Sequence, residues 1–141
     1  MHKRMDWFIP ISVGVAVLLS NIIKELFHIY TQKTFSWYVL LLQTGGMPSS
    51  HSAAVTALTV AIYLSEGIPS LFWLSVVFSA IIIRDSFGVR KSVSDQAAIL
   101  NNLLSQAKMK EKVKIVLGHT PLQVAVGVCI GFFTPVVIYT I

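Results

Sequence analysis

Long uncharged stretches are the feature that most limits what this chain can fold into. Residues 7–23 and 115–141 contain no charged side chain, and residues 34–83 contain only Glu66. Charged residues make up 12% of the chain, about half of the fraction that soluble domains use to cover their surfaces. A disordered chain is not this apolar either. The sequence therefore predicts an integral membrane protein, with residues 1–141 forming a single membrane-embedded domain.

Four apolar segments approach the length of roughly 20 residues that a membrane-spanning helix needs, namely residues 7–27, 49–64, 68–83 and 121–141. Residues 92–114 differ, because their apolar side chains recur on one helical face and the segment ends in lysines. We expect an amphipathic helix there, at the membrane interface; the alternative is a solvated helix with a lysine tail. The predicted fold class is all-α: an integral membrane helical bundle of about four spans plus an amphipathic interfacial helix.

If the four apolar segments cross the membrane in turn, both chain ends lie on one side of it. Polar residues from distant positions in the sequence then meet on the other side. That side holds nine basic and four acidic residues. The positive-inside rule then predicts that it faces the cytoplasm, and we expect the plasma membrane as the location. Positive charge beside apolar segments favours anionic membrane lipids as partners and argues against nucleic acid.

The first motif with chemical content is TGGMPSSHS at residues 44–52. Glycines and a proline directly before a helix make a turn, and the free N–H groups at a helix start bind anions, so Gly46 is expected to contact phosphate. Ser49 and Ser50 add hydroxyl groups that bind phosphate or cap the helix. His51 places a titratable proton donor beside them. The alternative is an ordinary helix start with an interfacial histidine.

The second motif pairs His119 with Gln123, four residues later, so that both side chains lie on one helical face. The carbonyl oxygen of Gln123 would accept the Nδ1–H of His119, which leaves Nε2 available to attack phosphorus. The alternative is a pair of polar residues at a helix start.

The third motif consists of charged residues at the ends of membrane segments, where such groups are costly unless they are paired or functional. We expect Lys24, Arg84 and Arg90 to hold phosphoryl oxygens, and Asp85 to orient one of the arginines. The alternative for these cations is anchoring at the membrane surface, with Lys24 extending towards the headgroups.

These motifs together favour phosphoryl transfer, with His119 as the nucleophile and His51 as the acid. No acidic cluster offers a metal site, and the single cysteine, Cys129, allows neither a disulfide framework nor a cysteine-based zinc site. We therefore predict a metal-independent reaction without a cofactor.

The chain also resembles a known family, on the segments 44–53 (TGGMPSSHSA), 85–91 (DSFGVRK), 96–101 (QAAILN) and 117–124 (LGHTPLQV). It is similar to the divergent branch of the type-2 phosphatidic acid phosphatase superfamily, which is related to vanadium-dependent haloperoxidases. The resemblance covers nearly the whole chain, and its first segment is the most specific.

The resemblance implies a role for each matching position. His51 would protonate the leaving group and His119 would form a phosphohistidine. Gln123 stands where the superfamily has an aspartate. Ser50 stands where the superfamily motif has a glycine, and Lys24 would correspond to the lysine of its first motif. The arginine that the superfamily has shortly before the nucleophile is absent here, and Arg84 or Arg90 would take its role.

The predicted function is a membrane lipid phosphatase that hydrolyses a phosphomonoester or diphosphate, such as phosphatidylglycerophosphate or phosphatidate. The main alternative is a non-catalytic membrane protein that binds a lipid phosphate. A vanadate-dependent haloperoxidase-like activity and a small ion or proton transporter are further alternatives. Gly127 and Gly131 form a GxxxG pattern, from which we expect a homodimer.

Overall fold

The chain is predominantly helical in the part that the computed structural model describes, which comprises residues 7–37, 40, 46–109, 111–113 and 118–141. No strand occurs within these ranges, and the predicted all-α fold class is confirmed. In chain order the helices are α1 (Phe8–Gln32), α3 (Ser50–Glu66), α4 (Ser70–Phe87), α5 (Val89–Gln106) and α6 (Pro121–Thr140).

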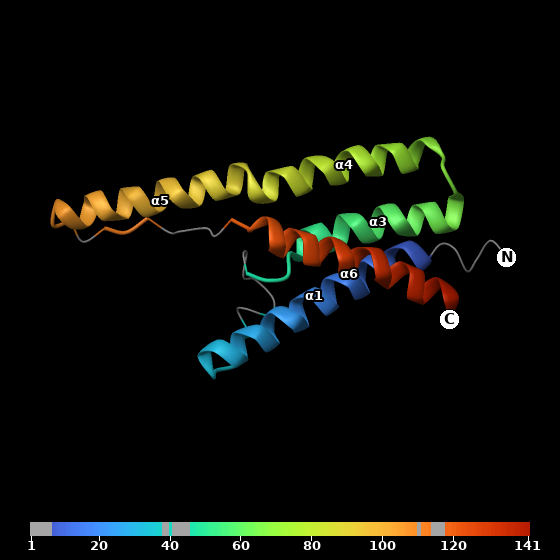
Figure 1. Ribbon diagram of the computed structural model, residues 1–141, viewed down its shortest axis with the longest axis horizontal. Helices are drawn as coiled ribbons and strands as arrows, with labels where there is room; N and C mark the ends of the chain where they lie inside the picture. Colours follow the sequence, from blue (N-terminus) through green and yellow to red (C-terminus); the bar gives the residue numbers. More distant parts are fainter. Residues whose placement is uncertain (1–6, 38–39, 41–45, 110, 114–117) are drawn as a thin grey trace.

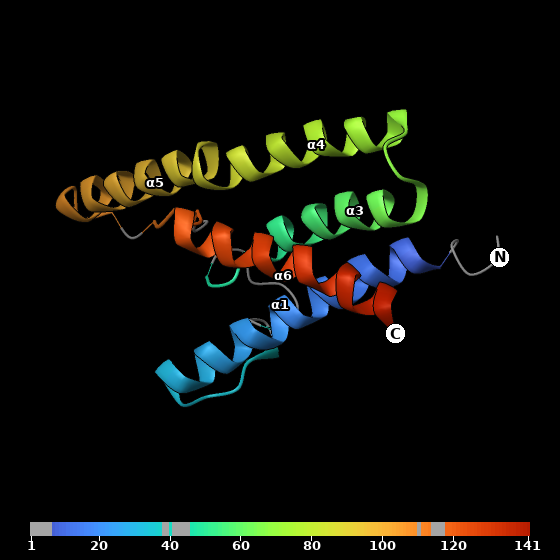
Figure 2. The same ribbon diagram turned by 45° about the vertical axis from the view of Figure 1, so that its right-hand side comes forward.

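Helix α3 lies in the middle of the bundle and packs against α1, α4 and α6 (Figure 1). The helices α1, α3, α4 and α6 run in alternating directions, as expected for segments that cross a membrane in turn (Figure 1). The start of α1 and the end of α6 lie at one end of the bundle, while the starts of α3 and α6 and the end of α4 lie towards the other (Figure 2). We call this second end the polar end.

Length and hydropathy make the bundle suited to a bilayer. Helices α1 and α6 and the helical stretch Ser70–Gln106 are long and apolar enough to cross a membrane. Helix α3 has 17 residues, which cover roughly 26 Å, against about 30 Å for a hydrocarbon core. Large apolar side chains such as Trp73 and Phe133 are exposed on the outer faces of the bundle. Lipid is the solvent in which such a surface is stable.

Small residues allow α6 to approach α3 closely. A Cβ atom at Gly127 would collide with the carbonyl oxygen of Ser49, and one at Gly131 would collide with that of Ala53. The GxxxG pattern is therefore used inside the chain, between α6 and α3. Because both glycines face α3, the GxxxG pattern offers no free surface to a helix of a second copy. The pattern therefore does not support the expected homodimer, which itself stays a prediction.

Helix α5 departs from the amphipathic segment expected at residues 92–114. It begins at Val89, directly after α4, continues in the direction of α4 beyond the other helices, and ends at Gln106 (Figures 1 and 2). The predicted continuation of the helix to residue 114 is wrong. Lys108 adopts a left-handed conformation with φ 56°, which ends the helix before the lysines would repel one another on adjacent turns.

The chain then returns along α5. The side-chain amide of Asn101 donates to the carbonyl oxygen of Val113 at 2.9 Å, and its carbonyl oxygen accepts the N–H of Val113 at 2.8 Å. Asn101 thus holds both backbone groups of one residue in the segment that leads to the start of α6.

Candidate functional site

A buried histidine lies where three distant segments meet at the polar end. His119 directly precedes the cap of α6 and is only 3% exposed. Its backbone N–H donates to the carbonyl oxygen of Ser86 at 3.0 Å. Its ring nitrogen Nδ1 lies 3.1 Å from the carbonyl oxygen of Gly46 and 3.4 Å from Oε1 of Gln123. The end of α4, the turn before α3 and the start of α6 therefore fix one imidazole.

These contacts decide which ring nitrogen carries the proton. Both groups near Nδ1 are carbonyl oxygens, which only accept hydrogen bonds, so Nδ1 bears the hydrogen and Nε2 keeps its lone pair. The orientation of the Gln123 amide is set independently, because Oε1 also accepts the N–H of Thr120 at 3.0 Å. The Thr120 hydroxyl in turn accepts the N–H of Gln123, which completes a capping box at the start of α6.

The start of α3 is joined to the start of α6. The N–H of Ser49 donates to the carbonyl oxygen of Gln123 at 3.1 Å. The Ser49 hydroxyl caps α3 by accepting the N–H of Ser52, and the Ser52 hydroxyl lies 2.9 Å from it. Ser49 is fully buried. The prediction that its hydroxyl binds phosphate does not fit this geometry, because that hydroxyl serves the helix start.

Two helix N-termini consequently lie side by side, those of α3 and α6. Each carries the positive end of a helix dipole, and α3 also presents backbone N–H groups without a partner inside the helix. At the start of α6, Pro121 has no N–H and Thr120 caps that of Gln123. Ser50, which is half-buried, opens α3, and His51 follows it in the first turn. The arrangement favours a negatively charged ligand.

A buried lysine adds positive charge to this end of the bundle. Lys24 of α1 is 5% exposed, although its charged head lies on a helix that is otherwise apolar over most of its length. A Cβ atom at Gly46 would lie 3.8 Å from the aliphatic stem of Lys24. The two residues also border the same cavity, of about 120 Å³. The structure thus places Lys24 beside the turn that holds His119, and its predicted contact with phosphate stays a prediction.

Electrostatics keep the imidazole of His119 neutral. Burial lowers its pKa from the usual 6.5, the hydrogen bond with Gln123 opposes this shift, and the charges of Lys24 and His51 lower the pKa further. His51 lies in the first turn of α3, whose start is joined to the start of α6 by Ser49 and Gln123, so both histidines belong to the polar end. A neutral imidazole with a free Nε2 lone pair is a nucleophile.

Arg84, Asp85 and Arg90, which were also predicted to belong to the site, lie at the end of α4 and the start of α5. Arg84 is exposed in the last turn of α4, two residues before the carbonyl group of Ser86 that holds His119. Asp85 between them is half-buried. Arg90 is the second residue of α5, and its side chain lies outside the described part. The roles expected for these three residues stay predictions.

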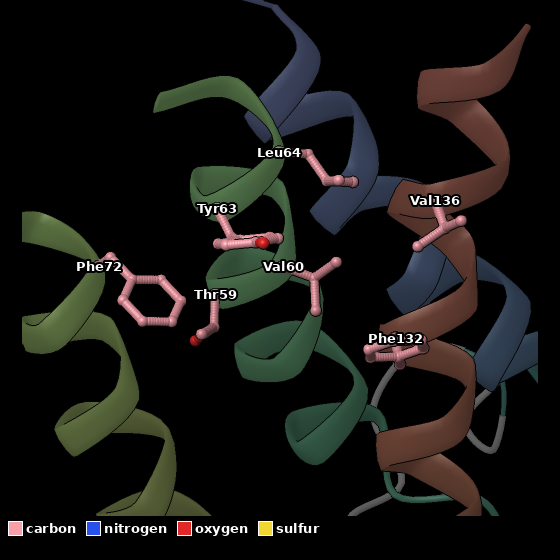
Figure 3. Close-up of a pocket in the computed structure, with 7 residues that line it drawn as sticks. All are labelled: Thr59, Val60, Tyr63, Leu64, Phe72, Phe132 and Val136. Atoms are coloured by element: carbon pink, nitrogen blue, oxygen red, sulfur yellow. The ribbon is translucent and has the colours of Figure 1, made fainter. Parts of the chain in front are cut away.

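An apolar groove lies farther along the bundle, between α3, α4 and α6 (Figure 3). Its volume is about 340 Å³. Tyr63 and Phe72 lie towards each other at one side of it, while Phe132 and Val136 of α6 border the other side. The groove begins at Thr59, nine residues after the start of α3, which corresponds to about 14 Å along the helix axis.

Sequence reasoning missed several residues near the site. Glu25 is buried on α1 and accepts the N–H of Ser36 at 2.7 Å, and His28 lies one turn later. Their Glu-x-x-His spacing was the only signal in the sequence. The carbonyl contacts of Gly46 and Ser86 carry no sequence signal, because every residue has a carbonyl group. Within the described ranges, no group of three His, Cys, Asp or Glu side chains is placed to hold a metal ion.

Fold and site together define a helical integral membrane protein with a neutral, oriented histidine at its cationic end. The family model of the divergent PAP2 family matches residues 8–134, and the chain belongs to that family. It is 33% identical over 145 residues to the uncharacterized membrane protein YuiD of Bacillus subtilis (strain 168), and the match covers 91% of each chain. No solved structure matches the chain.

Proposed function

We propose that the chain is a metal-independent lipid phosphate phosphatase that acts through a phosphohistidine at His119. The observation that carries this proposal is the pair of carbonyl acceptors at Nδ1 of His119, which leaves the Nε2 lone pair available. Membership of the divergent PAP2 family supports the reaction class.

In the first step, Nε2 of His119 attacks phosphorus, and the bond between phosphorus and the lipid oxygen breaks. The leaving alkoxide takes a proton from the imidazolium of His51. In the second step, a water molecule attacks the phosphohistidine, His51 accepts a proton from that water, and inorganic phosphate leaves. Both histidines return to their starting protonation states.

Gln123 makes this histidine unusual for such a reaction. When Nε2 gains the phosphoryl group, the imidazole ring becomes cationic, and its Nδ1–H is stabilised by two neutral carbonyl oxygens, of Gly46 and Gln123. A carboxylate in the place of Gln123 would stabilise this cation more strongly. We expect a slow phosphatase rather than an inactive one.

The phosphate would lie at the paired N-termini of α3 and α6, beside Lys24. Backbone N–H groups, Ser50 and the ammonium group of Lys24 would bind its oxygens, with Arg84 and Arg90 completing the set. The lipid chain would extend along α3 into the apolar groove of Figure 3. Phosphatidylglycerophosphate and phosphatidate are the substrates that we favour.

The test is phosphate release by the purified protein in detergent, with these two lipids and with a lipid diphosphate. His119→Ala and His51→Ala should each lower kcat by at least about a hundredfold, because each removes a reacting group. Ser70→Ala, at the opposite end of the bundle, is the matched control and should keep full activity. All variants are compared by size-exclusion profile and thermal unfolding. Full activity of His119→Ala would refute the proposed site.

A non-catalytic lipid phosphate binding protein is the second candidate, favoured by the neutral partner Gln123 and by the 3% exposure of His119. In that case lipid phosphates would bind saturably, and the purified protein would release no phosphate from any of them. Trapping of a labelled phosphohistidine after acid-free quenching distinguishes the candidates, because only the phosphatase forms it.

We also propose that the polar end faces the cytoplasm and that the protein lies in the plasma membrane. The excess of positive charge at the polar end supports this orientation. In a Cys129→Ser background, Lys108→Cys should react with an impermeant thiol reagent only in opened cells, and Ile68→Cys should react in intact cells. The reverse pattern would overturn the orientation.

A further inference from the structure

A second polar cluster lies on α1 next to the candidate site, and the proposed mechanism does not use it. The Glu25 side chain is 5% exposed, and its Oε1 accepts the N–H of Ser36. Its other oxygen, Oε2, is buried and has no hydrogen-bond partner among the described residues. Nδ1 of His28 is likewise buried without a partner in that part of the chain, and lies 3.9 Å from Oε1 of Glu25.

Such a pair requires an explanation, because an unpartnered buried polar atom is costly, and a buried carboxylate more so. The two groups face each other at slightly more than hydrogen-bonding distance. An Nδ1–H on His28 directed at Oε1 of Glu25 gives the ring nitrogen a partner once the ring moves closer, and contacts of this kind often shorten when a ligand binds. Oε2 stays without a partner among the described residues. The carboxylate then orients the ring and makes Nε2 the nitrogen that meets a ligand.

His28 borders a cavity that holds both polar and apolar side chains. The His28 side chain is 24% exposed and borders the cavity of about 120 Å³ that Lys24 and Gly46 also border. Thr31 and Gln32 add a hydroxyl and an amide to the lining. Because the carbonyl of Gly46 also contacts His119, the cavity adjoins the place proposed for the phosphate.

We propose that this cavity is a subsite for the alcohol part of the substrate, where His28, oriented by Glu25, binds a free hydroxyl group next to the phosphoester. The proposal rests on the proposed function and makes it more specific. The preferred substrate class is a lipid phosphomonoester whose leaving group carries a hydroxyl beside the phosphate, as a glycerol headgroup does.

The charges around the cavity favour a hydroxyl over other ligands. The buried carboxylate of Glu25, next to His28, would repel a second phosphoryl group bonded directly to the first, which disfavours diphosphates. In phosphatidylglycerophosphate the second phosphate is separated from the first by the whole headgroup glycerol. The ammonium group of Lys24 would repel a metal ion, for which Glu25 and His28 supply only two ligands. A hydroxyl is neutral and can both donate and accept a hydrogen bond, so it fits an imidazole nitrogen and the Thr31 and Gln32 side chains.

The experiment measures binding and turnover separately. Binding of dioleoyl phosphatidylglycerophosphate and dioleoyl phosphatidate is measured in detergent with the His119→Ala protein, which cannot turn them over. The glycerol-bearing lipid should bind about tenfold more tightly, the typical effect of one good hydrogen bond to a charged or oriented group. Adding His28→Ala or Glu25→Gln should reduce the ratio of the two affinities to near one, whereas Tyr30→Phe, on an exposed side of α1, should leave it unchanged.

Equal affinity for the two lipids in the His119→Ala protein, or an undiminished ratio in both His28→Ala and Glu25→Gln, would overturn the subsite. His28→Ala keeps the test available if Glu25→Gln does not fold, since His28 is the more exposed of the two. Tight binding that appears only with added Zn²⁺ or Mn²⁺ would instead indicate a metal site and overturn the proposal. Absence of turnover in the wild-type protein bears on the phosphatase proposal alone, because the binding ratio does not depend on catalysis.

Discussion

The imidazole of His119 donates its Nδ1–H to the carbonyl oxygen of Gly46, 73 positions earlier in the chain, at 3.1 Å. This single contact links the turn before α3 to the start of α6. Gly46 adopts φ +87°, a left-handed conformation that residues with a Cβ atom rarely take. The position of the carbonyl group therefore depends on glycine.

Gly46→Ala should lower phosphate release at least about tenfold and destabilise the protein by about 1–2 kcal/mol, because the backbone must leave φ +87° or be strained there. Space is not the cause, since the new Cβ would meet only the Lys24 stem, at 3.8 Å. Gly67→Ala is the matched control, with φ +79° and nothing within 4 Å at the opposite end of the bundle. It should show a similar loss of stability with full activity; equal activity losses in both variants would contradict the role of Gly46.

The pH dependence of the reaction should reflect His119, which reacts only as the neutral imidazole. Burial lowers the pKa of His119 from 6.5, so the acidic limb of the kcat/KM profile should have its midpoint below pH 6.5. At high pH the activity should fall as His51 loses the proton that it must donate. Gln123→Glu places a carboxylate at Nδ1, which favours the protonated ring, raises the pKa and should move the midpoint of the acidic limb to higher pH by about one unit. A profile with the same midpoint in both proteins would exclude Gln123 as the partner that sets this pKa.

Close packing of α6 on α3 predicts that alanine destabilises the protein at Gly131 but not at Gly14. Gly131→Ala should lower the free energy of unfolding by about 2–3 kcal/mol, because its Cβ would meet the Ala53 carbonyl oxygen and the Thr56 side chain. Gly14→Ala, on α1, meets nothing within 4 Å and should leave stability unchanged or raise it slightly. Thermal or denaturant unfolding in detergent measures both. If Gly131→Ala were as stable as Gly14→Ala, the described α3–α6 contact would be wrong.

The two hydrogen bonds between Asn101 and Val113 can be tested with alanine at two neighbouring positions. Asn101→Ala removes both the donor to the Val113 carbonyl and the acceptor of the Val113 N–H, so amide exchange at Val113 should accelerate by about tenfold or more. Asn102→Ala changes an exposed neighbour and should leave this exchange rate unchanged. Similar acceleration in both variants would show that these two hydrogen bonds do not protect the Val113 amide.

The apolar groove of Figure 3 predicts a dependence on the length of the lipid chain. Val136→Phe fills part of the groove and should lower kcat/KM for a long-chain phosphatidate about tenfold, while a short-chain analogue that does not reach it is hydrolysed at the wild-type rate. Val137→Phe, exposed on the same helix but outside the groove lining, is the control. An equal loss for both chain lengths would show that the groove does not receive the chain.

Local sequence patterns were sufficient for the membrane class and for most of the helices. The uncharged stretch before Lys24 predicts α1, and the turn signals at Gly67 and Pro69 separate α3 from α4. The predicted contact of His119 with Gln123 is present, but its predicted cause is wrong. His119 precedes the cap of α6, and Gln123 reaches back to it as part of the capping box with Thr120. The end of α5 was missed, because a conformational change at Lys108 outweighed the helical period.

The sequence by itself therefore determined the apolar helices, the unequal charge on the two sides of the bundle, and the residue types capable of phosphate chemistry. Only the tertiary structure decided which backbone groups hold His119, that Ser49 caps a helix, that Gly127 and Gly131 pack on α3, and that His28, 3.9 Å from Glu25, shares a cavity with Lys24. The reason is physical. Hydropathy and periodicity act between neighbours in the chain, whereas these contacts join segments whose distance is set by the packing of separate helices.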